Sequence, residues 1–325
     1  MIVSANDFKK YNTSLNVIEG EPMSRHTSFK VGGAARFFIS PSSKEQLIDV
    51  ILACKEEGIE YTVIGRGSNL IVSDEGYDGM IICLGDGFSF IMKEDGDIER
   101  SVKEDGDIER SVKEDGGYTY ITASAGAGLI SLSSQVRREG LAGLEFACGI
   151  PGSVGGAIYM NAGAHGGQMS DVVSRVTVID RQGRAKKLSA EEMNFGYRHS
   201  AAMDEGYVVV DATFKLSNGD KDEMEKTVKE NLSRRKQSQP LEYPSAGSVF
   251  KRPEGTFAGK LIEDAGLKGF SIGGAEVSDK HAGFIVNKGD ATAADVVAVI
   301  EHVTKVVLEK FGVKLEPEVR FLGKF

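Results

Sequence analysis

Glycine dominates one stretch of this sequence, and that stretch could lie against a large flat ligand. Residues 149–167 read GIPGSVGGAIYMNAGAHGG and contain seven glycines, with only small or apolar residues between them apart from one Asn and one His. Without a Cβ atom, backbone N–H groups can approach a phosphate or a ring closely, and positive φ angles become accessible. The alternative is a tight packing crossover between buried strands, which would use the same residues.

A second glycine-bearing segment has the form of a phosphate-binding loop between two strands. Residues 61–72 read YTVIGRGSNLIV, which is an apolar run, a Gly-Arg-Gly-Ser-Asn turn and a second apolar run. It is not a Walker loop, because no Lys-Ser/Thr pair follows the glycines. It is not the G-x-G-x-x-G fingerprint either, because Leu70 stands where the third glycine belongs. If this loop binds a pyrophosphate, it must do so with a pattern that differs from both of these.

The segment before this loop predicts a β-α-β unit. Residues 35–39 are apolar and predict a strand, and Ser42 with Glu45 forms a capping box for a helix that ends at Gly58. A strand at 61–65 follows. We therefore expect a small parallel or mixed sheet with helices in the N-terminal part of the chain.

The later segments predict antiparallel strands and two long helices. Residues 172–180 and 207–216 read as strands, and a charged helix begins after Gly219. The apolar face of this helix is expected to hold Met224, Val228 and Leu232 at a spacing of four. A last helix, residues 292–310, has Thr292 and Asp295 as its cap and a stripe of Val and Ile along one face.

A ten-residue tandem copy interrupts the middle of the chain. KEDGDIERSV occupies residues 93–102, recurs at 103–112 and begins again at 113. Each copy has only two strongly apolar residues, so it cannot build a core. We interpret the copy as a duplication that lengthens a surface hairpin, with an acidic docking loop as the alternative.

Composition excludes several classes of protein. The formal net charge of -9 leaves no broad basic field for nucleic acid or an anionic membrane, and no apolar run is long enough to span a bilayer. The three cysteines are odd in number and far apart, and the sequence start shows no signal peptide, so we expect a cytoplasmic protein. The five histidines show no metal-site spacing, so no metal is predicted.

Five motifs occur in an order that resembles one known family. They are GRGSNLIV, GIPGSVGGAIYMNAGA, YRHS at 197–200, SAGSVFKRP at 245–253 and LEPEVRF at 315–321. Together they resemble the UDP-N-acetylenolpyruvoylglucosamine reductases, which are FAD enzymes of bacterial peptidoglycan synthesis. The resemblance covers nearly the whole chain, from residue 25 to the last strand.

The resemblance implies a fold and a reaction. The fold would be α+β (mixed α/β), with a two-part FAD-binding region of the PCMH/vanillyl-alcohol-oxidase type and a smaller α+β substrate domain. The reaction would be NADPH-dependent reduction of UDP-N-acetylenolpyruvoylglucosamine to UDP-N-acetylmuramate through non-covalent FAD. The expected partners are therefore a UDP-sugar and NADPH, with neither nucleic acid nor membrane, and the protein is expected to be a monomer. The expected parts are residues 1–84 with a returning strand at 313–325 (first FAD-binding subdomain), 85–218 (second) and 219–312 (substrate domain).

Three catalytic residues follow from the resemblance. Arg198 would bind the substrate carboxylate as negative charge builds beside it, and Ser248 would donate a proton to the resulting carbanion. Glu318 would orient the substrate or assist protonation, and the PEVR spacing selects it over Glu316. From the residues alone, Arg198 would be a surface salt-bridge residue and Ser248 a turn hydroxyl.

The resemblance also assigns binding residues, and this chain fits the subgroup that lacks a tyrosine-bearing loop between Arg198 and Ser248. Tyr197, Lys251 and Arg252 would bind the substrate, with the cluster Arg234, Arg235 and Lys236 as a weaker candidate. The residues assigned to FAD are Gly65, Arg66, Gly67, Ser68 and Asn69 at the pyrophosphate and Gly126, Gly149, Pro151, Gly152, Gly155 and Asn161 at the ribityl chain and ring.

Two alternatives remain, one enzymatic and one non-catalytic. An FAD-dependent sugar or alcohol oxidase would share the flavin fold, but such enzymes often attach flavin to a His in the pyrophosphate loop, and GRGSN has none. Denaturation would show whether the yellow colour stays with the polypeptide. A non-catalytic nucleotide-binding module is the second alternative, and bleaching of bound flavin by NADPH would contradict it.

Overall fold

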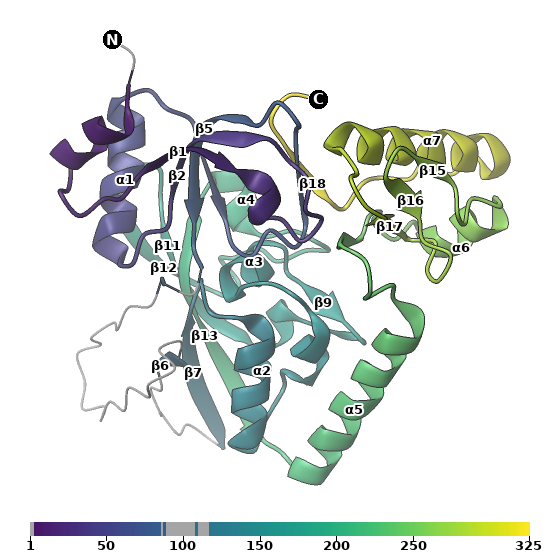
Figure 1. Ribbon diagram of the computed structural model, residues 1–325. Coiled ribbons are helices and arrows are strands. Elements are labelled where there is room, and N and C mark those ends of the chain that lie inside the picture. The colour runs from purple at the N-terminus through teal and green to yellow at the C-terminus, as the bar shows by residue number, and fades with distance from the viewer. Residues whose placement is uncertain (1–2, 86, 89–107, 110–116) are drawn as a thin grey trace. The chain divides into compact units, whose positions relative to one another are not determined.

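The computed structural model describes residues 3–85, 87–88, 108–109 and 117–325 (Figure 1). The chain divides into two compact units. The first comprises Met1–Ile18, Phe38–Arg66 and Met80–Ser233, and the second comprises Glu19–Phe37, Gly67–Gly79 and Arg234–Phe325. The composition change predicts a boundary at residue 219, whereas the last unit boundary lies at Arg234, because most of helix α5 (Lys221–Ser238) belongs to the first unit.

The helices alternate with strands along the described part of the chain. The α-helices are α1 (Lys44–Glu56), α2 (Leu129–Arg138), α3 (Val154–Tyr159), α4 (Ala201–Glu205), α5 (Lys221–Ser238), α6 (Ala258–Asp264) and α7 (Ala293–Phe311). Short 3-10 helices are η1 (Ala5–Lys10), η2 (Met23–Arg25), η3 (Glu145–Gly149) and η4 (Met169–Asp171).

Most strands are short, and β13 is the long one among those described. The strands before the glycine-rich run are β1 (Ile18–Pro22), β2 (Ala34–Ile39), β3 (Tyr61–Ile64), β4 (Leu70–Val72), β5 (Tyr77–Cys83), β6 (Ile108–Glu109), β7 (Tyr118–Ser124) and β8 (Leu141–Ala142). Those within or after it are β9 (Gly163–Ala164), β10 (Gly167–Gln168), β11 (Val173–Ile179), β12 (Ala185–Ser189), β13 (Val208–Asn218), β14 (Ser245–Ser248), β15 (Ser271–Ile272), β16 (Ala275–Val277), β17 (Phe284–Asn287) and β18 (Arg320–Leu322).

The first unit is built on an antiparallel sheet around β13. The strand order is β12-β11-β13-β7-β6, and β8 also pairs with β13. Residues 208–214 of β13 are buried without alternation, which indicates that both faces of this strand are covered. Helix α3 packs against β13 and β7, so the sheet supports the glycine-rich run that contains this helix.

A parallel pair of strands and helix α1 also belong to the first unit. Strand β3 pairs with β5 from Tyr61↔Met80 to Ile64↔Cys83, and β3 is the last strand in the order β1-β2-β5-β3. The predicted cap of α1 is wrong by one residue. Ser43, not Ser42, is the N-cap, and its hydroxyl accepts a hydrogen bond from the N–H of Gln46. Ser42 instead bonds to the Gln46 side chain.

The second unit packs a four-stranded sheet against helix α7. The strand order is β14-β17-β16-β15, and the core includes Val296, Val299, Ile300, Val303 and Val307 of the helix. The predicted capping box of Thr292 and Asp295 is confirmed. The last strand returns to an N-terminal segment, because β18 pairs in parallel with β4. This pairing brings the PEVR motif beside the end of the Gly-Arg-Gly-Ser-Asn turn.

Two further predictions can be compared with the described residues. In α5, Met224 and Val228 are buried as predicted, but the prediction for Leu232 is wrong: it is 42% exposed, and Asn231 is buried in its place. Within the tandem copy, Ile108 and Glu109 form β6, which pairs with β7. The rest of the copy lies outside the described residues.

No helix among the described residues is long and apolar enough to cross a membrane. Within the same residues, no group of three or more His, Cys, Asp and Glu side chains has the arrangement of a metal site. All three cysteines are free thiols, and Cys54 and Cys148 are buried.

An acidic residue is buried in the central sheet of the first unit. Asp211 on β13 lies between Thr177 on β11 and Ser124 on β7. Asp211 Oδ2 and Ser124 Oγ are buried and have no hydrogen-bond partner within the described part of the chain. Burial raises the pKa of the Asp211 carboxyl, and a hydrogen bond with Thr177 offsets part of this effect.

This burial predicts a pH-dependent gain of stability in an Asp211→Asn variant. A folded-state pKa above the unfolded value means that stability is lost as pH rises from the unfolded pKa to the folded one. The asparagine side chain of the variant does not ionise, so its stability is not lost in this way. We therefore expect the free energy of unfolding to rise by about 1 kcal/mol at pH 7.5. At pH 4 the gain should shrink. Urea titrations at both pH values measure it, and a loss of stability at pH 7.5 would show that the carboxylate ion is stabilising.

Candidate functional site: a glycine-lined cavity and two polar clusters

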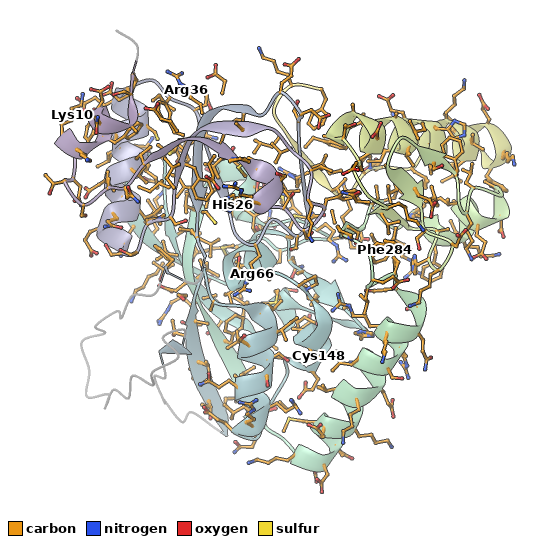
Figure 2. The ribbon with its side chains drawn as sticks, in the orientation of Figure 1. Lys10, His26, Arg36, Arg66, Cys148 and Phe284 are labelled. Atoms are coloured by element: carbon orange, nitrogen blue, oxygen red, sulfur yellow. The ribbon has the colours of Figure 1, made fainter. Side chains whose placement is uncertain are left out.

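The predicted pyrophosphate loop begins at Gly65, where two segments of the first unit approach closely. A Cβ atom on Gly65 would overlap the hydroxyl of Ser153, which is the N-cap of α3. The carbonyl of Gly65 accepts a weak hydrogen bond from the Cys83 thiol at 3.6 Å. Arg66 follows, and its guanidinium lies beside Gly128, the N-cap of α2, so that a Cβ there would lie 3.1 Å from Arg66 Nη2 (Figure 2).

The loop continues in the second unit, where Gly67 needs to be glycine for two reasons. Its φ of 59° lies in the left-handed region, and a Cβ atom would overlap the carbonyl of His26. Ser28 N–H donates to the Gly67 carbonyl at 3.1 Å, and Ser28 Oγ donates to the Ser245 carbonyl at 2.6 Å. Residues 25–33 (RHTSFKVGG) therefore hold this loop in place and link it to β14.

We expect Gly67→Ala to lose both stability and bound flavin. The positive φ and the overlap with His26 together should cost about 2–5 kcal/mol. The matched control is Gly58→Ala, because Gly58 has a φ of 66° but open space around its Cβ position, so it should lose only about 1–2 kcal/mol. Denaturation curves and the absorbance ratio of flavin to protein measure both effects. If both variants lose stability and flavin to the same extent, the contact between Gly67 and His26 does not hold the loop in place.

The glycine-rich run is used largely for close packing inside the first unit. A Cβ atom on Gly155 would lie 2.7 Å from that of Ala125, and one on Gly167 would meet the ring of Phe146. Gly126 likewise faces the carbonyl of Gly85. Close packing, the alternative interpretation of the glycine-rich run, therefore explains why Gly126, Gly155 and Gly167 are glycines. Of the other predicted cofactor residues in this run, Gly149 is buried, Gly152 is half-buried and Pro151 is exposed.

Strand β3, helix α3 and the start of β13 line a cavity of about 570 Å³ in the first unit. This volume lies within the usual range of small-molecule sites. Gly65, Gly155 and Gly156 line the cavity without side chains, so the backbone of its wall can approach a dinucleotide phosphate closely. The residues thus fit FAD. The wall residues on which the argument depends are Tyr61, Gly65, Ser153, Gly155, Arg181 and Val208.

Arg198 lies in a strained turn of the first unit. Gly196 and His199 exchange two backbone hydrogen bonds across Tyr197 and Arg198, and Arg198 has a φ of 55°. A positive φ is costly for a long side chain and is found most often where function requires it. The Arg198 guanidinium donates to the Gly163 carbonyl at 3.4 Å and lies 5.1 Å from the centre of the 55%-exposed Tyr197 ring.

Asn161 holds this turn against the glycine-rich run. Its side-chain N–H donates to the Gly196 carbonyl at 2.9 Å, and its side-chain oxygen accepts from Ser170 N–H at 2.9 Å. Ser200 Oγ adds a bond of 2.8 Å to the Tyr159 carbonyl. Asn161 is 2% exposed, so the structure gives its side chain a positioning role that the motif did not reveal.

Ser248 and Glu318 belong to neighbouring backbone segments in the second unit. Glu318 N–H donates to the carbonyl of Val249, the residue after Ser248, at 2.7 Å. Asn69, from the pyrophosphate loop, donates a side-chain N–H to the Glu318 carbonyl at 3.1 Å. Ser248 is exposed at the end of β14, after Gly247, whose φ is 78°. The fold thus gathers three motifs that are far apart in sequence.

The predicted substrate residues of the second unit lie beside this cluster. Lys251 N–H donates to the Glu316 carbonyl, and Lys251 Nζ pairs with the Glu316 carboxylate at 3.3 Å. The Arg252 guanidinium lies 4.1 Å from the centre of the Phe257 ring, which is 58% exposed. Sequence reasoning missed Phe257, because an exposed phenylalanine near a helix start has no distinctive pattern.

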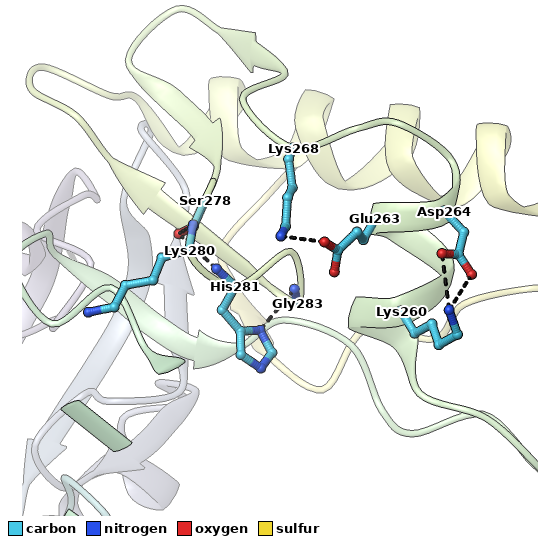
Figure 3. A network of polar contacts seen from close by, with 8 residues as sticks. All are labelled: Lys260, Glu263, Asp264, Lys268, Ser278, Lys280, His281 and Gly283. Atoms are coloured by element: carbon cyan, nitrogen blue, oxygen red, sulfur yellow. Dashed lines mark hydrogen bonds and ion pairs between the residues drawn. The ribbon is translucent and has the colours of Figure 1, made fainter. Parts of the chain in front are cut away.

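A polar network orders the loop between β16 and β17 in the second unit. Ser278 Oγ accepts from the N–H groups of Lys280 and His281, and Gly283 N–H donates to His281 Nδ1 at 3.1 Å (Figure 3). Burial lowers the pKa of His281. A neutral ring whose Nδ1 accepts carries its proton on Nε2, so His281 presents a donor on that side.

Comparisons with known proteins give a family match for an N-terminal and a C-terminal part of the chain. Residues 35–189 match the profile of an "FAD binding domain", and residues 239–322 match "UDP-N-acetylenolpyruvoylglucosamine reductase, C-terminal domain". UDP-N-acetylenolpyruvoylglucosamine reductase from Agathobacter rectalis is 47% identical over 96% of this chain and 95% of its own length. That from Clostridium botulinum (strain Hall) is 48% identical over 95% and 93%. The crystal structure of UDP-N-acetylenolpyruvylglucosamine reductase from Thermus caldophilus gives a TM-score of 0.75 at 32% identity, over 95% of this chain and 99% of that one.

Proposed function

Since this chain belongs to the UDP-N-acetylenolpyruvoylglucosamine reductase family, we propose that NADPH is its electron donor and that Arg198, Ser248 and Glu318 serve its substrate step. The protein is an FAD-dependent oxidoreductase that reduces UDP-N-acetylenolpyruvoylglucosamine in peptidoglycan precursor synthesis. Its fold is mixed α/β with an FAD-binding domain of the vanillyl-alcohol-oxidase/PCMH type.

Bound FAD supplies the hydride chemistry, and the protein supplies binding, orientation and electrostatics. In the first unit, Gly65, Arg66 and the glycine-rich run with Gly126, Gly149, Pro151, Gly152 and Gly155 would hold the cofactor. In the second unit, Gly67, Ser68 and Asn69 would contribute backbone and side-chain groups to its pyrophosphate. The observation that supports this assignment is the cavity that Gly65, Gly155 and Gly156 line.

Arg198 would bind the carboxylate of the enolpyruvyl group. Reduction adds a hydride to the methylene carbon and leaves negative charge on the carbon that bears the carboxylate. A guanidinium can meet a carboxylate with two charge-assisted hydrogen bonds, which strengthen as this charge develops. The bonds from Asn161 and Ser200 hold the backbone of this turn, and the Arg198 side chain donates to the Gly163 carbonyl. Tyr197, which is exposed beside it, would contact the substrate.

Ser248 would donate the proton that completes the reduction, and Glu318 would orient the substrate. A carbanion beside a carboxylate is basic enough to take a proton from a hydroxyl group. The exposed position of Ser248 and the backbone bond between Glu318 and Val249 support these roles. Lys251 and Arg252, which follow on the same segment, would bind the diphosphate of the UDP-sugar.

The proposal includes a cytoplasmic and monomeric enzyme. Three free thiols are consistent with a reducing compartment, since oxidising compartments favour disulfides. Gel filtration with light scattering would measure the mass of the particle directly.

The proposed electron donor and substrate are tested by the visible spectrum of the purified protein. NADPH should bleach the flavin bands under anaerobic conditions, and UDP-N-acetylenolpyruvoylglucosamine should restore them. UDP-N-acetylglucosamine is the matched control, because it lacks the double bond, and it should not restore them. Acid precipitation should leave the yellow colour in solution. A flavin that NADPH does not bleach would refute the proposed donor.

A further inference from the structure

The side chain of Asn69 makes a contact in the second unit that the roles assigned above do not use. Its Nδ2 atom donates a hydrogen bond of 3.1 Å to the carbonyl of Glu318. The backbone carbonyl of Asn69 accepts a hydrogen bond of 3.0 Å from the N–H of Arg320. A single residue of the Gly-Arg-Gly-Ser-Asn turn therefore holds the chain on both sides of Val319, which is buried.

Strand pairing by itself does not reach Glu318. Strand β18 begins at Arg320, which pairs with Leu70 of β4, so Glu318 lies before the paired region. Glu316 and Pro317 are exposed, so the chain runs over the surface immediately before Glu318. Here the amide group of Asn69 takes the place that a backbone N–H would have in a strand pair. It thus extends the attachment of this segment back to Glu318.

The backbone of Glu318 is also attached to the segment that carries Ser248. Glu318 N–H donates to the carbonyl of Val249 at 2.7 Å, and Val249 N–H donates to the carbonyl of Gly283 at 2.9 Å. Glu318 is therefore bonded through its N–H to the residue after Ser248 and through its carbonyl to Asn69. Loss of the Asn69 amide would remove one of these two attachments.

We propose that Asn69 is a positioning residue for the substrate step, because its side-chain amide fixes the backbone from which the Glu318 carboxylate extends. This inference rests on the proposed role of Glu318. A displacement of about 1 Å in a positioned group can slow a reaction by about 10²-fold. The turn that is proposed to hold the pyrophosphate of FAD would then also fix a residue that orients the substrate.

The test removes the amide and leaves the backbone of the turn in place. Asn69→Ala keeps the carbonyl that accepts from Arg320. Stopped-flow absorbance under anaerobic conditions measures its two half-reactions separately. We expect recovery of the flavin bands with UDP-N-acetylenolpyruvoylglucosamine to be about 10- to 100-fold slower than in the wild type. Bleaching by NADPH, and the Kd for FAD measured with the apoprotein by fluorescence quenching, should stay within about twofold of the wild type.

The matched control is Ser73→Ala. Ser73 directly follows β4, whereas Asn69 directly precedes it, and the Ser73 hydroxyl accepts a hydrogen bond of 3.2 Å from the N–H of Glu75. Each variant therefore loses one bond between a side chain and the backbone at an end of the same strand. Ser73→Ala should keep the wild-type rates in both half-reactions. If it slows recovery as much as Asn69→Ala does, a general disturbance of β4 explains the effect and the inference is wrong.

A double-mutant cycle tests whether Asn69 acts through Glu318. In a Glu318→Ala background, Asn69→Ala should slow recovery by less than about twofold, since the group that it positions is absent. An undiminished effect in that background would overturn the inference. So would recovery of Asn69→Ala at the wild-type rate, or a loss of FAD affinity as large as the loss of recovery rate. Recovery of Glu318→Ala alone at the wild-type rate would instead contradict the proposed role of Glu318.

Discussion

Ser248→Ala should lower kcat by about 10²- to 10⁴-fold, which is the usual contribution of a positioned proton donor. The hydroxyl is proposed to give its proton to the carbon beside the substrate carboxylate, and alanine has no proton to give. Because Ser248 is exposed at the end of β14, its loss should leave the melting temperature and the flavin content unchanged. Steady-state NADPH oxidation with the enolpyruvyl substrate measures the effect.

The matched control for this prediction is Ser245→Ala. Ser245 lies at the other end of the same short strand, and the bond that it contributes to the loop brace is through its backbone carbonyl. We expect its kcat to stay within about twofold of the wild type, since surface substitutions away from special features have small effects. Similar losses in both variants would mean that β14 itself was disturbed and that Ser248 has no special role.

Arg198→Lys should lower kcat by about 10²- to 10³-fold, as the loss of one transition-state donor usually does. Lysine keeps the positive charge but cannot make two parallel bonds to a carboxylate. Arg184→Lys is the control, because Arg184 binds Asp180 in the same unit and has no proposed role in the reaction. A kcat that is unchanged in Arg198→Lys would show that charge alone is sufficient at this position.

A second substitution at the same position separates catalysis from folding. Arg198 has a φ of 55°, which glycine adopts without strain. Arg198→Gly should therefore be as stable as the wild type or more stable by about 0.5–1 kcal/mol, while its activity is lost. Thermal unfolding with the same preparations measures this. A large loss of stability would indicate that Arg198 has a structural role, because the strain would then be outweighed by its contacts.

The sequence predicted the elements with strong local signals. The capping box of Thr292 and Asp295 and the Val/Ile stripe of α7 were predicted correctly, because both are fixed by neighbours within the helix. The cap of α1 was placed one residue early, since Ser42 and Ser43 are adjacent and both have a suitable residue three positions later. Leu232 was placed on the buried face of α5 because helical spacing alone does not show where a packing partner ends.

Only part of the candidate site could be predicted from the sequence. The motifs select Arg198, Ser248 and Glu318 as candidates, but they carry no sign of the positive φ at Arg198. The role of Asn161 was also hidden, because its partner Gly196 lies 35 residues away and is reached only through tertiary contact. The composition of the glycine-rich run is evident in the sequence, but the contact of Gly155 with Ala125 becomes visible only when both segments are seen together.

Ser248 is proposed to act only after the flavin has been reduced. Stopped-flow absorbance separates the two half-reactions of Ser248→Ala: bleaching by NADPH, and recovery with UDP-N-acetylenolpyruvoylglucosamine under anaerobic conditions. We expect a bleaching rate within about twofold of the wild type and a recovery slowed by about 10²-fold or more. Equal slowing of both half-reactions, or recovery at the wild-type rate, would contradict it.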